Sequence, residues 1–553
     1  MLDNFEHLVA APALDLLSRI LQQAPDVKLL VTSRVRLNLA AEQLYDLGGL
    51  PYPPGTASAS VQDFPAIELF VRRSQRVRPD FPTSPATLSS VARICQMTDG
   101  LPLAIELAAA WSRSMTPAEI ADELARGLAL LASSAWDLPA RHRSMAAVFE
   151  HSWLLLDKAE QSALAQLSVC RGGFDRAAAQ EIAAAGPSLL QNLVDRSLLR
   201  VDSAGRFDMH PMIRQFADEK LAQRAAADAA AARARHARHF ATLTGRREDD
   251  FHGAQDRQAL QWMQREADNI RAAWEWGVGE ADGELLECFI ESFLYFFDIQ
   301  GRYRECVELT GQALDALHAR NSVSQRNRVS TSRALGRLHA LHAAFRFRLG
   351  EFERARQDAE QSLTLLEPLR PHRDVGHARL YLGAAWYGLG DLDKSVQWFL
   401  AAVETYEEAG HAWGIGAALD NAGFLEFLRG DLAAAEAHLT RALAVADGTG
   451  SRYLLTGVFD HLAALTVGQG RFDESLAYVE RCRQVLDELD RPYIVASLSL
   501  SLSRIALQAG DLVAAQEHID RALRVARDTG NQLDLVHFLL QLGAVEVLSL
   551  IHI

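Results

Sequence analysis

The sequence is poor in cysteine and has no long apolar run. Its five cysteines are Cys95, Cys170, Cys288, Cys306 and Cys482. They form no CxxC pair and have no Cys/His spacing suited to zinc. This scatter argues against a disulfide framework and a zinc site. No run of about 18 apolar residues could span a bilayer, and no charged start with an apolar core marks a signal peptide. We therefore expect a cytoplasmic protein with reduced thiols and no membrane partner.

The chain also lacks an excess of basic residues. It has 56 Lys and Arg against 71 Asp and Glu, a formal net charge of −15 and a pI near 5.7. This balance argues against a broad nucleic-acid footprint, although it is compatible with a small basic patch. A length of 553 residues predicts three or more domains, and 49% hydrophobic with 23% charged residues is typical of globular protein.

The first 50 residues alternate helical and extended patterns. An acidic cluster from Asp3 to Glu6 is followed by an apolar helical stretch, Leu8 to Ala24. The run Val27 to Val31 then reads as a short strand ending near Arg34. Such alternation predicts part of a parallel α/β sheet in residues 1–50.

Residues 51–222 read as helical. Residues 51–85 are rich in proline and polar residues and lead to a helix at Ala66–Arg76, and "TDGLPLAIELAAAW" opens another helix, so we predict a helical domain over 51–135. In residues 136–222, "LLRVDSAGRFDMHPMIRQFADEKL" places two apolar runs around a Ser-Ala-Gly turn, which indicates a hairpin wing on a helical bundle. Residues 223–285 contain an alanine-rich stretch, Arg224–Phe240, which we interpret as a solvated linker helix, with a basic stripe as the alternative.

The second half is a repeat of 40 residues. Its glycines are Gly350, Gly390, Gly430, Gly470 and Gly510. Two residues after each comes an apolar residue: Phe352, Leu392, Leu432, Phe472 or Leu512. Five residues after each comes a small one: Ala355, Ser395, Ala435, Ser475 or Ala515. The pattern predicts helices that end at a glycine turn and second helices that approach closely at the small residue.

These units resemble the tetratricopeptide repeat. The resemblance rests on the Leu-Gly-x-x-aromatic register of "YLGAAWYGLGDLDKSVQWFLAA" and predicts an α-solenoid over 286–553. HEAT-like repeats share the length and are the competing interpretation. Leu542 and Gly543 keep the register, which predicts a half-built last hairpin; the tail Leu548–Ile553 reads like a translated sequencing adapter, with a natural apolar tail as the alternative.

Three segments, in order, resemble the signal-transduction ATPases with numerous domains, which include the NB-ARC-type switches. "LDNFEHL" resembles the Walker B segment, "LLVTSR" the sensor arginine segment and "GLPLAIELAAAW" the GLPLA segment. The stretch from "RHRSMAAVFEH" to "LVDRSLL" is similar to the helical and winged-helix part of bacterial regulators of the AfsR and LuxR-ATPase kind. The resemblance implies a mainly α chain: the end of a nucleotide-binding α/β domain, a helical domain, a winged helix and a tetratricopeptide-like solenoid.

The phosphate-binding loop of that family, GxxxxGK[ST], is missing from the sequence. We therefore expect Met1 to lie inside a longer reading frame whose product binds ATP or ADP with Mg²⁺. Without the loop and its lysine the phosphates lose most of their contacts. This chain alone is predicted to hydrolyse nothing and to hold no nucleotide cofactor firmly.

The resemblance assigns roles to residues near the start. Asp3 would order the Mg²⁺ hydration shell, with Asn4 and Glu6 near the attacking water. The alternative is a helix N-cap made by Asp3 or Asn4. Arg34 would sense the γ-phosphate, whereas a surface ion pair is its alternative and Arg36 its rival.

Two further segments receive nucleotide roles by resemblance. Gly100 and Pro102 of the GLPLA segment would bind the nucleotide; Pro102 would pack on the adenine, and it also suits the first turn of a helix. His210 matches the histidine of the MHD segment, which touches the β-phosphate of ADP; Pro211 replaces the aspartate, so the part of the lock that depends on it is in doubt. The alternative for His210 is a structural histidine.

The resemblance implies a switch that regulates transcription. The repeats would bind a protein or small-molecule inducer, and the open ATP state would oligomerise and release an effector, often a DNA-binding domain. A non-enzymatic adaptor is the alternative. Direct DNA binding through the winged helix is a third, but the recognition segment Ser188–Leu198 sets Asp195 against a single Arg196, which favours packing within the chain.

Overall fold

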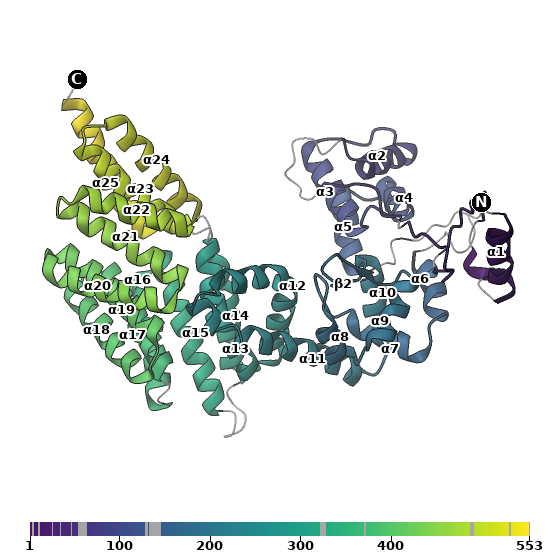
Figure 1. Cartoon of the computed structure of the whole chain (residues 1–553), viewed down its shortest axis with the longest axis horizontal. Coiled ribbons are helices and arrows are strands. Elements are labelled where there is room, and N and C mark those ends of the chain that lie inside the picture. Colours follow the sequence, from purple (N-terminus) through teal and green to yellow (C-terminus); the bar gives the residue numbers. More distant parts are fainter. Residues whose placement is uncertain are drawn as a thin grey trace. The chain divides into compact units, whose positions relative to one another are not determined.

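The structure, a computed structural model, divides into two compact units, residues 1–239 and 240–553 (Figure 1). It describes residues 1–2, 5–8, 11–24, 26–33, 35–45, 47–53, 63–127, 131, 145–320, 328–369, 372–486, 492–529 and 532–551. In this part of the chain, no helix has the length and apolar character needed to cross a membrane.

The first unit is built mainly of short helices. They are η1 (Phe5–Leu8), α1 (Ala11–Gln23), α2 (Pro65–Val77), α3 (Pro85–Met97), α4 (Pro102–Ala110), η3 (Trp111–Arg113), α5 (Pro117–Arg126), α6 (Met145–Leu154), α7 (Lys158–Leu167), α8 (Arg176–Ala183), α9 (Pro187–Asp195) and α10 (Pro211–Ala222). Helix α11 (Ala226–Gly245) contains the boundary between the units.

The first 50 residues contain a small core instead of a sheet. Phe5, Leu17 and Leu37 are buried together. The predicted strand at Val27–Val31 forms one parallel bridge, between Leu2 and Val31, so the described residues do not show the predicted parallel sheet and it stays a prediction. A central parallel strand is covered on both faces, whereas Leu30 keeps 64% of its surface exposed.

Helices α2 to α5 start at prolines, which suit the first helical turn because the missing N–H has no partner there. Ser84 caps α3, and Thr116 forms a capping box with Glu119 at α5. The apolar faces of these helices meet at side chains with no exposed surface, such as Phe70 and Ile120. The helix predicted at Ala66–Arg76 is confirmed by α2.

A β-hairpin precedes α10. Strand β1 (Arg200–Val201) pairs antiparallel with β2 (Phe207–Asp208). The turn closes because Asp202 Oδ1 accepts hydrogen bonds from two backbone N–H groups and Gly205 adopts a φ of 78°. The hairpin predicted around the Ser-Ala-Gly turn is therefore present.

The second unit is a series of helical hairpins. Its elements are η6 (Asp249–His252), α12 (Asp256–Glu280), α13 (Gly283–Gln300), α14 (Tyr303–Arg320), α15 (Arg328–Arg348), α16 (Phe352–Leu366), η8 (Glu367–Leu369), α17 (His372–Gly388), α18 (Leu392–Ala409), α19 (Ala412–Arg429), α20 (Leu432–Thr449), α21 (Arg452–Gly468), α22 (Phe472–Leu486), α23 (Pro492–Gln508), α24 (Leu512–Thr529) and α25 (Gln532–Ile551). The side chains of Leu548–Ile553 lie outside the description, so the prediction about this tail is not tested.

The predicted glycine turns are confirmed. All five repeat glycines adopt positive φ between 75° and 85°, a conformation that costs glycine least. The apolar residue two places later is in each case the first residue of the second helix. The small residue of each repeat is completely buried.

Two of the small residues are serines that tie the paired helices together. Ser395 Oγ donates to the carbonyl of Gly383 (2.6 Å), and Ser475 Oγ donates to the carbonyl of Ala463 (2.9 Å). A hydrogen bond between such close backbones requires a short side chain at this position. The five-residue spacing therefore marks the line of contact within each hairpin.

A contact distant in sequence joins the start of the second unit to its fourth complete repeat. Asp256, at the start of α12, accepts hydrogen bonds from the backbone N–H groups of Arg452 (2.7 Å) and Tyr453 (3.2 Å), and the Arg452 guanidinium donates to it at 3.0 Å. His252 stacks on Trp413 at 5.0 Å and lies 3.1 Å from Glu291. We call this set, His252, Asp256, Trp413 and Arg452, the clasp.

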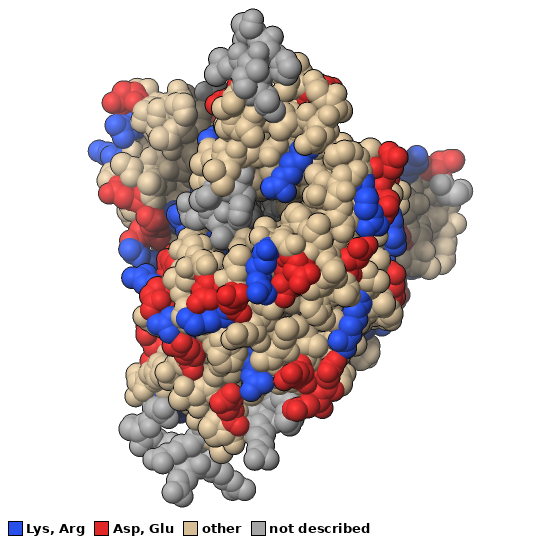
Figure 2. Space-filling model, turned by 90° about the vertical axis from the view of Figure 1, so that its left-hand side faces the viewer, with Lys and Arg blue, Asp and Glu red and all other residues tan. Residues whose placement is uncertain are grey.

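Charges on the surface alternate in sign. On the face shown in Figure 2, basic and acidic side chains are interspersed and neither sign forms a large area. Many are paired one turn apart on the second helices, as in Arg356 with Glu353 and Arg483 with Glu480. Such exposed pairs add little stability, but they leave no broad basic surface on this face.

Candidate ligand sites

In the first unit, Asp99 is the centre of a polar cluster. It follows α3 with a φ of 48°, which turns its carboxylate toward the segment before α2 and toward the hairpin. The Tyr52 hydroxyl donates to Oδ1 (2.7 Å), and the Arg200 guanidinium donates to Oδ2 (2.9 Å). Burial, together with the hydrogen bond to Asp99, raises the pKa of Tyr52 to about 12. Residues far apart in the sequence thus share one carboxylate.

His210 points into this cluster. It is the N-cap of α10, and its Nδ1 accepts the backbone N–H of Met212 at 3.1 Å. An acceptor nitrogen carries no proton, so the neutral ring has its proton on Nε2. Burial lowers the pKa of His210 to about 4, against the opposing effect of Asp99. The 3.4 Å approach of Nε2 to Asp99 Oδ2 is therefore not an ion pair at neutral pH.

The Nε2–H group of His210 is a buried donor. The side chain is 5% exposed, and Nε2 has no hydrogen-bond partner among the described residues. A buried donor without a partner costs free energy, about 1–3 kcal/mol in typical cases. Such a group is suited to a ligand oxygen.

Gly100 and Pro102 lie beside Asp99, and both have structural roles. The Leu50 N–H donates to the Gly100 carbonyl (2.8 Å), and a Cβ added to Gly100 would lie 2.1 Å from the Leu50 carbonyl oxygen. With a φ of 67°, only glycine fits this position without strain. Pro102 is the first residue of α4. The structure thus brings His210 to 3.4 Å from the carboxylate of Asp99, the residue before Gly100.

The nucleotide roles of Gly100, Pro102 and His210 stay predictions, and the other predicted site residues lie within the first 34 positions. Asp3, Asn4 and Arg34 lie outside the described residues, and Glu6 lies in η1 with a side chain that is not described. The backbones of their two segments are adjacent, because the Phe5 N–H donates to the Thr32 carbonyl at 3.0 Å. Over the described ranges, no group of three or more His, Cys, Asp or Glu residues is arranged to hold a metal ion.

Two charged residues at the C-terminal end of α9, Asp195 and the C-cap Arg196, are engaged within the chain. Asp195 lies 3.4 Å from the guanidinium of Arg36, the rival of Arg34, and its carbonyl accepts the Arg36 N–H. Arg196 lies 3.8 Å from Glu160. The expectation that this segment packs within the chain agrees with these contacts.

In the second unit, a cavity of about 160 Å³ lies among the first helices of successive hairpins. We call it the inner pocket. Its walls come from α13, α15, α17, α19, α21 and α23, with Phe399 from α18. Its aromatic residues are Phe345, Phe347, Tyr381, Tyr387, Phe399, Trp413, Phe424 and Tyr453. Its charged and strongly polar residues are Asp298, Arg348, Asp420, Asn421 and His461.

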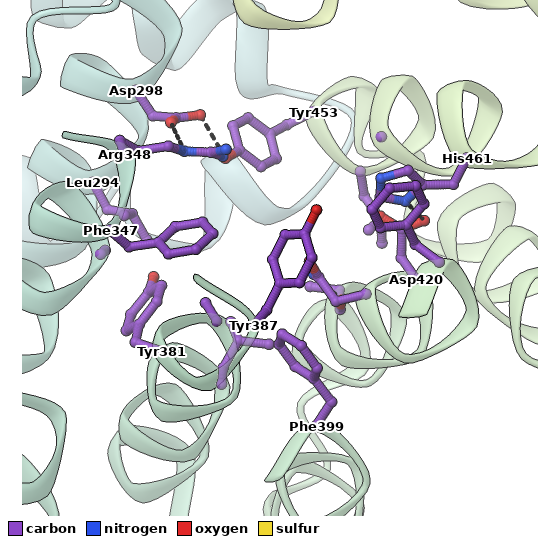
Figure 3. A pocket seen from close by; sticks show the side chains of 18 of the residues that line it. Leu294, Asp298, Phe347, Arg348, Tyr381, Tyr387, Phe399, Asp420, Tyr453 and His461 are labelled. Carbon is purple, nitrogen blue, oxygen red and sulfur yellow. Dashed lines mark hydrogen bonds and ion pairs between the residues drawn. The ribbon is translucent and has the colours of Figure 1, made fainter. Parts of the chain in front are cut away.

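The two carboxylates of the inner pocket have different partners (Figure 3). Asp298 accepts from the Tyr453 hydroxyl (2.7 Å) and lies 3.4 Å from Arg348. Asp420 Oδ1 lies 2.8 Å from His461 Nδ1, and the His461 ring stacks on Phe424 at 4.4 Å. Repeat spacing alone does not separate these residues from core residues, because they occupy the same helical faces.

Comparison with known proteins identifies the repeats. Residues 336–546 match the MalT-like TPR region family. The repeats are tetratricopeptide repeats (TPRs). The prediction of TPRs over HEAT-like repeats is confirmed for these residues, and we refer to the hairpins of the second unit as the TPR array.

The chain is also similar to mycobacterial proteins. It is 34% identical over 297 residues to the "Putative HTH-type transcriptional regulator Rv0890c" of Mycobacterium tuberculosis, covering 52% of this chain and 32% of the relative. It is 34% identical over 246 residues to the "Uncharacterized protein Rv0894" of the same organism, covering 42% of this chain and 60% of the relative. The chain thus spans about a third of the regulator's length.

Among solved structures, the chain is similar to a signal transduction ATPase with a tetratricopeptide repeat sensor, PH0952 from Pyrococcus horikoshii. The identity is 16%, the TM-score is 0.40, and 94% of this chain and 73% of that chain are covered. A Rap protein complexed with competence and sporulation factor has 16% identity and a TM-score of 0.37, covering 56% of this chain and 98% of that chain.

Proposed function

We propose that this chain is the signal-receiving part of a transcriptional regulator, with the TPR array as its sensor and the first unit as a nucleotide-responsive element. The observation that carries the sensor role is the inner pocket. The first helices of six successive hairpins converge on it, so occupancy of the pocket can alter how they pack. The similarity to an HTH-type regulator supports a role in transcription.

The nucleotide part of the proposal rests on the Asp99 cluster. The Nε2–H of His210 and the Arg200 guanidinium are donors suited to phosphate oxygens, and Gly100 directly follows Asp99 in the chain. A diphosphate would accept from the His210 Nε2–H, which has no partner among the described residues, and would compete with the Asp99 carboxylate for the Arg200 guanidinium. By family resemblance, Pro102 would pack on the adenine, and Asp3 would order the hydration shell of Mg²⁺.

The test is an ADP titration of the purified chain followed by calorimetry. In the His210→Asn variant, the asparagine side chain still caps α10 but lacks the second ring nitrogen, so we expect ADP affinity to fall about ten-fold. In the Asp99→Asn variant, the competing charge is removed, and we expect affinity to rise. Asp208→Asn on β2 removes a nearby exposed charge and should leave affinity unchanged.

A second outcome favours the adaptor. If the chain is an adaptor without a nucleotide role, as the missing phosphate-binding loop suggests, neither the wild type nor any variant should bind ADP. Unchanged affinity in both His210→Asn and Asp99→Asn would also contradict a nucleotide role for this cluster. In either case we expect no ATP hydrolysis by the chain alone, which a phosphate-release assay checks.

A further inference from the structure

Asp420 in the inner pocket has one carboxylate oxygen without a partner. Its Oδ1 is engaged by His461, and among the described residues no group donates a hydrogen bond to Oδ2. The residue is only 6% exposed. Burying a carboxylate is costly unless it is paired and hydrogen-bonded. The free oxygen is therefore a position where a donor, and above all a cation, would stabilise the site.

A glycine keeps this oxygen uncovered. Gly457 lies on α21, one helical turn before His461, and also lines the inner pocket. A Cβ added at Gly457 would lie 3.1 Å from Asp420 Oδ2 and would meet nothing else within 4 Å. Glycine within a helix is less stabilising than alanine, so Gly457 does not serve the stability of α21. Its effect here is to leave Asp420 Oδ2 uncovered.

The charge of the pocket favours a cation. Two carboxylates, Asp298 and Asp420, face one guanidinium, that of Arg348, which already pairs with Asp298. In Figure 3 the Asp298 and Arg348 pair lies apart from the Asp420 and His461 pair, and the Tyr387 hydroxyl points into the space between them. The negative charge of Asp420 is thus not balanced by the pocket's arginine.

The walls add an aromatic environment. Phe347 and Tyr381 line the cavity on the side of Asp298, and Tyr387 lies between the two carboxylates. Aromatic faces attract organic cations and provide apolar area for a ring or chain. A volume of about 160 Å³ suits a small molecule.

We propose that the inner pocket binds a small organic amine in its ammonium form, with the ammonium on Asp420 Oδ2 and the apolar part against Phe347, Tyr381 and Tyr387. This inference rests on the proposed sensor role of the TPR array and names the chemical class of its ligand. It needs neither nucleotide nor DNA.

The test compares three molecules of one shape and different charge on the full chain. Tyramine is the cation, 2-(4-hydroxyphenyl)ethanol the neutral analogue and 3-(4-hydroxyphenyl)propionate the anion. By calorimetry we expect tyramine to bind about ten-fold or more tightly than the neutral analogue, and the anion not to bind. Equal or tighter binding of the neutral or anionic molecule, or no binding of tyramine at about 1 mM, overturns the proposal.

Two variants locate the ammonium. Asp420→Asn keeps an oxygen for His461 but removes the charge, and it should abolish the preference for tyramine. Gly457→Ala places a methyl group 3.1 Å from Oδ2 and should weaken tyramine about ten-fold. Gly311→Ala on α14, where an added Cβ meets nothing within 4 Å, is the matched control. Unchanged affinity in Gly457→Ala would overturn the placement.

The outcomes separate this inference from the nucleotide proposal. Tyramine binding that depends on Asp420, together with no ADP binding, supports the amine site and rejects the nucleotide role. ADP binding without tyramine binding rejects the amine site alone.

Discussion

His210 caps α10 with one ring nitrogen and is also buried, and both features disfavour protonation of its ring. Its Nδ1 must accept the Met212 N–H to cap α10, and burial keeps the ring neutral. Protonation would place a hydrogen on Nδ1 and break the cap. The folded state therefore binds a proton more weakly at this ring than the unfolded state does.

This residue should make the stability of the first unit depend on pH. The pKa of His210 is about 4 in the folded state and near 6.5 when unfolded. A depressed histidine pKa contributes stability that is fully present above pH 6.5 and is lost as the pH falls toward 4. Linkage gives a loss of about 2 kcal/mol between pH 7 and pH 5.

The measurement is native-state hydrogen exchange of peptides from α10, in wild type and in His210→Asn. The asparagine does not titrate, so the stability difference between the two proteins should shrink by that amount as the pH falls from 7 to 5. A difference that is the same at both pH values would contradict a neutral buried ring.

The sequence predicted His210 and Gly100 as site residues but did not predict Asp99. The two predicted residues belong to motifs, whereas Asp99 lies next to Gly100 and carries no pattern of its own. Its partners Tyr52 and Arg200 are 47 and 101 positions away. Only the folded chain shows that they meet at one carboxylate.

At the scale of elements, the TPR hairpins depend on close approach of paired helices. Gly423 on α19 faces α20, and a Cβ added there would lie 2.7 Å from Leu439 and 3.2 Å from the carbonyl of Ala435. The register was readable from the sequence because the same turn and the same small residue return every 40 positions. The α/β segment stays a prediction, because among the described residues its apolar run Val27–Val31 forms one parallel bridge.

The same substitution should therefore have opposite effects at two helical glycines. Gly423→Ala should destabilise the TPR array by about 1–3 kcal/mol, because the new methyl group overpacks the contact between α19 and α20. Gly311→Ala on α14 meets open space and should stabilise by up to about 1 kcal/mol through helix propensity. Urea unfolding followed by circular dichroism measures both. Stabilisation by both variants would show that the hairpins tolerate wider spacing.

At the scale of the whole molecule, the clasp joins helices of the second unit that would not be connected if each repeat contacted only the repeats next to it. In a simple solenoid each repeat contacts only its neighbours, and unfolding can begin at any end. Here Asp256 binds the start of α21, 196 residues further along the chain. We therefore expect α12 and α21 to open together.

Removal of the Asp256 carboxylate tests this coupling. In Asp256→Ala, hydrogen exchange should become faster at the starts of both α12 and α21. Asp391→Ala is the matched control, because Asp391 caps α18 through the Lys394 N–H and has no distant partner among the described residues. In that control only α18 should exchange faster. If exchange in Asp256→Ala became faster in α21 alone, Asp256 would act only as a local cap of that helix and would not couple α12 to α21.

The clasp also gives the TPR array a mechanical property. An open superhelix extends under load like a spring, because its pitch changes through small rotations shared among all repeats. With Asp256 fixed to the start of α21, the span from α12 to α21 forms a closed loop of fixed circumference. Pulling on that span would load the few hydrogen bonds of Asp256 first, so the array should be stiff until they break and compliant afterwards.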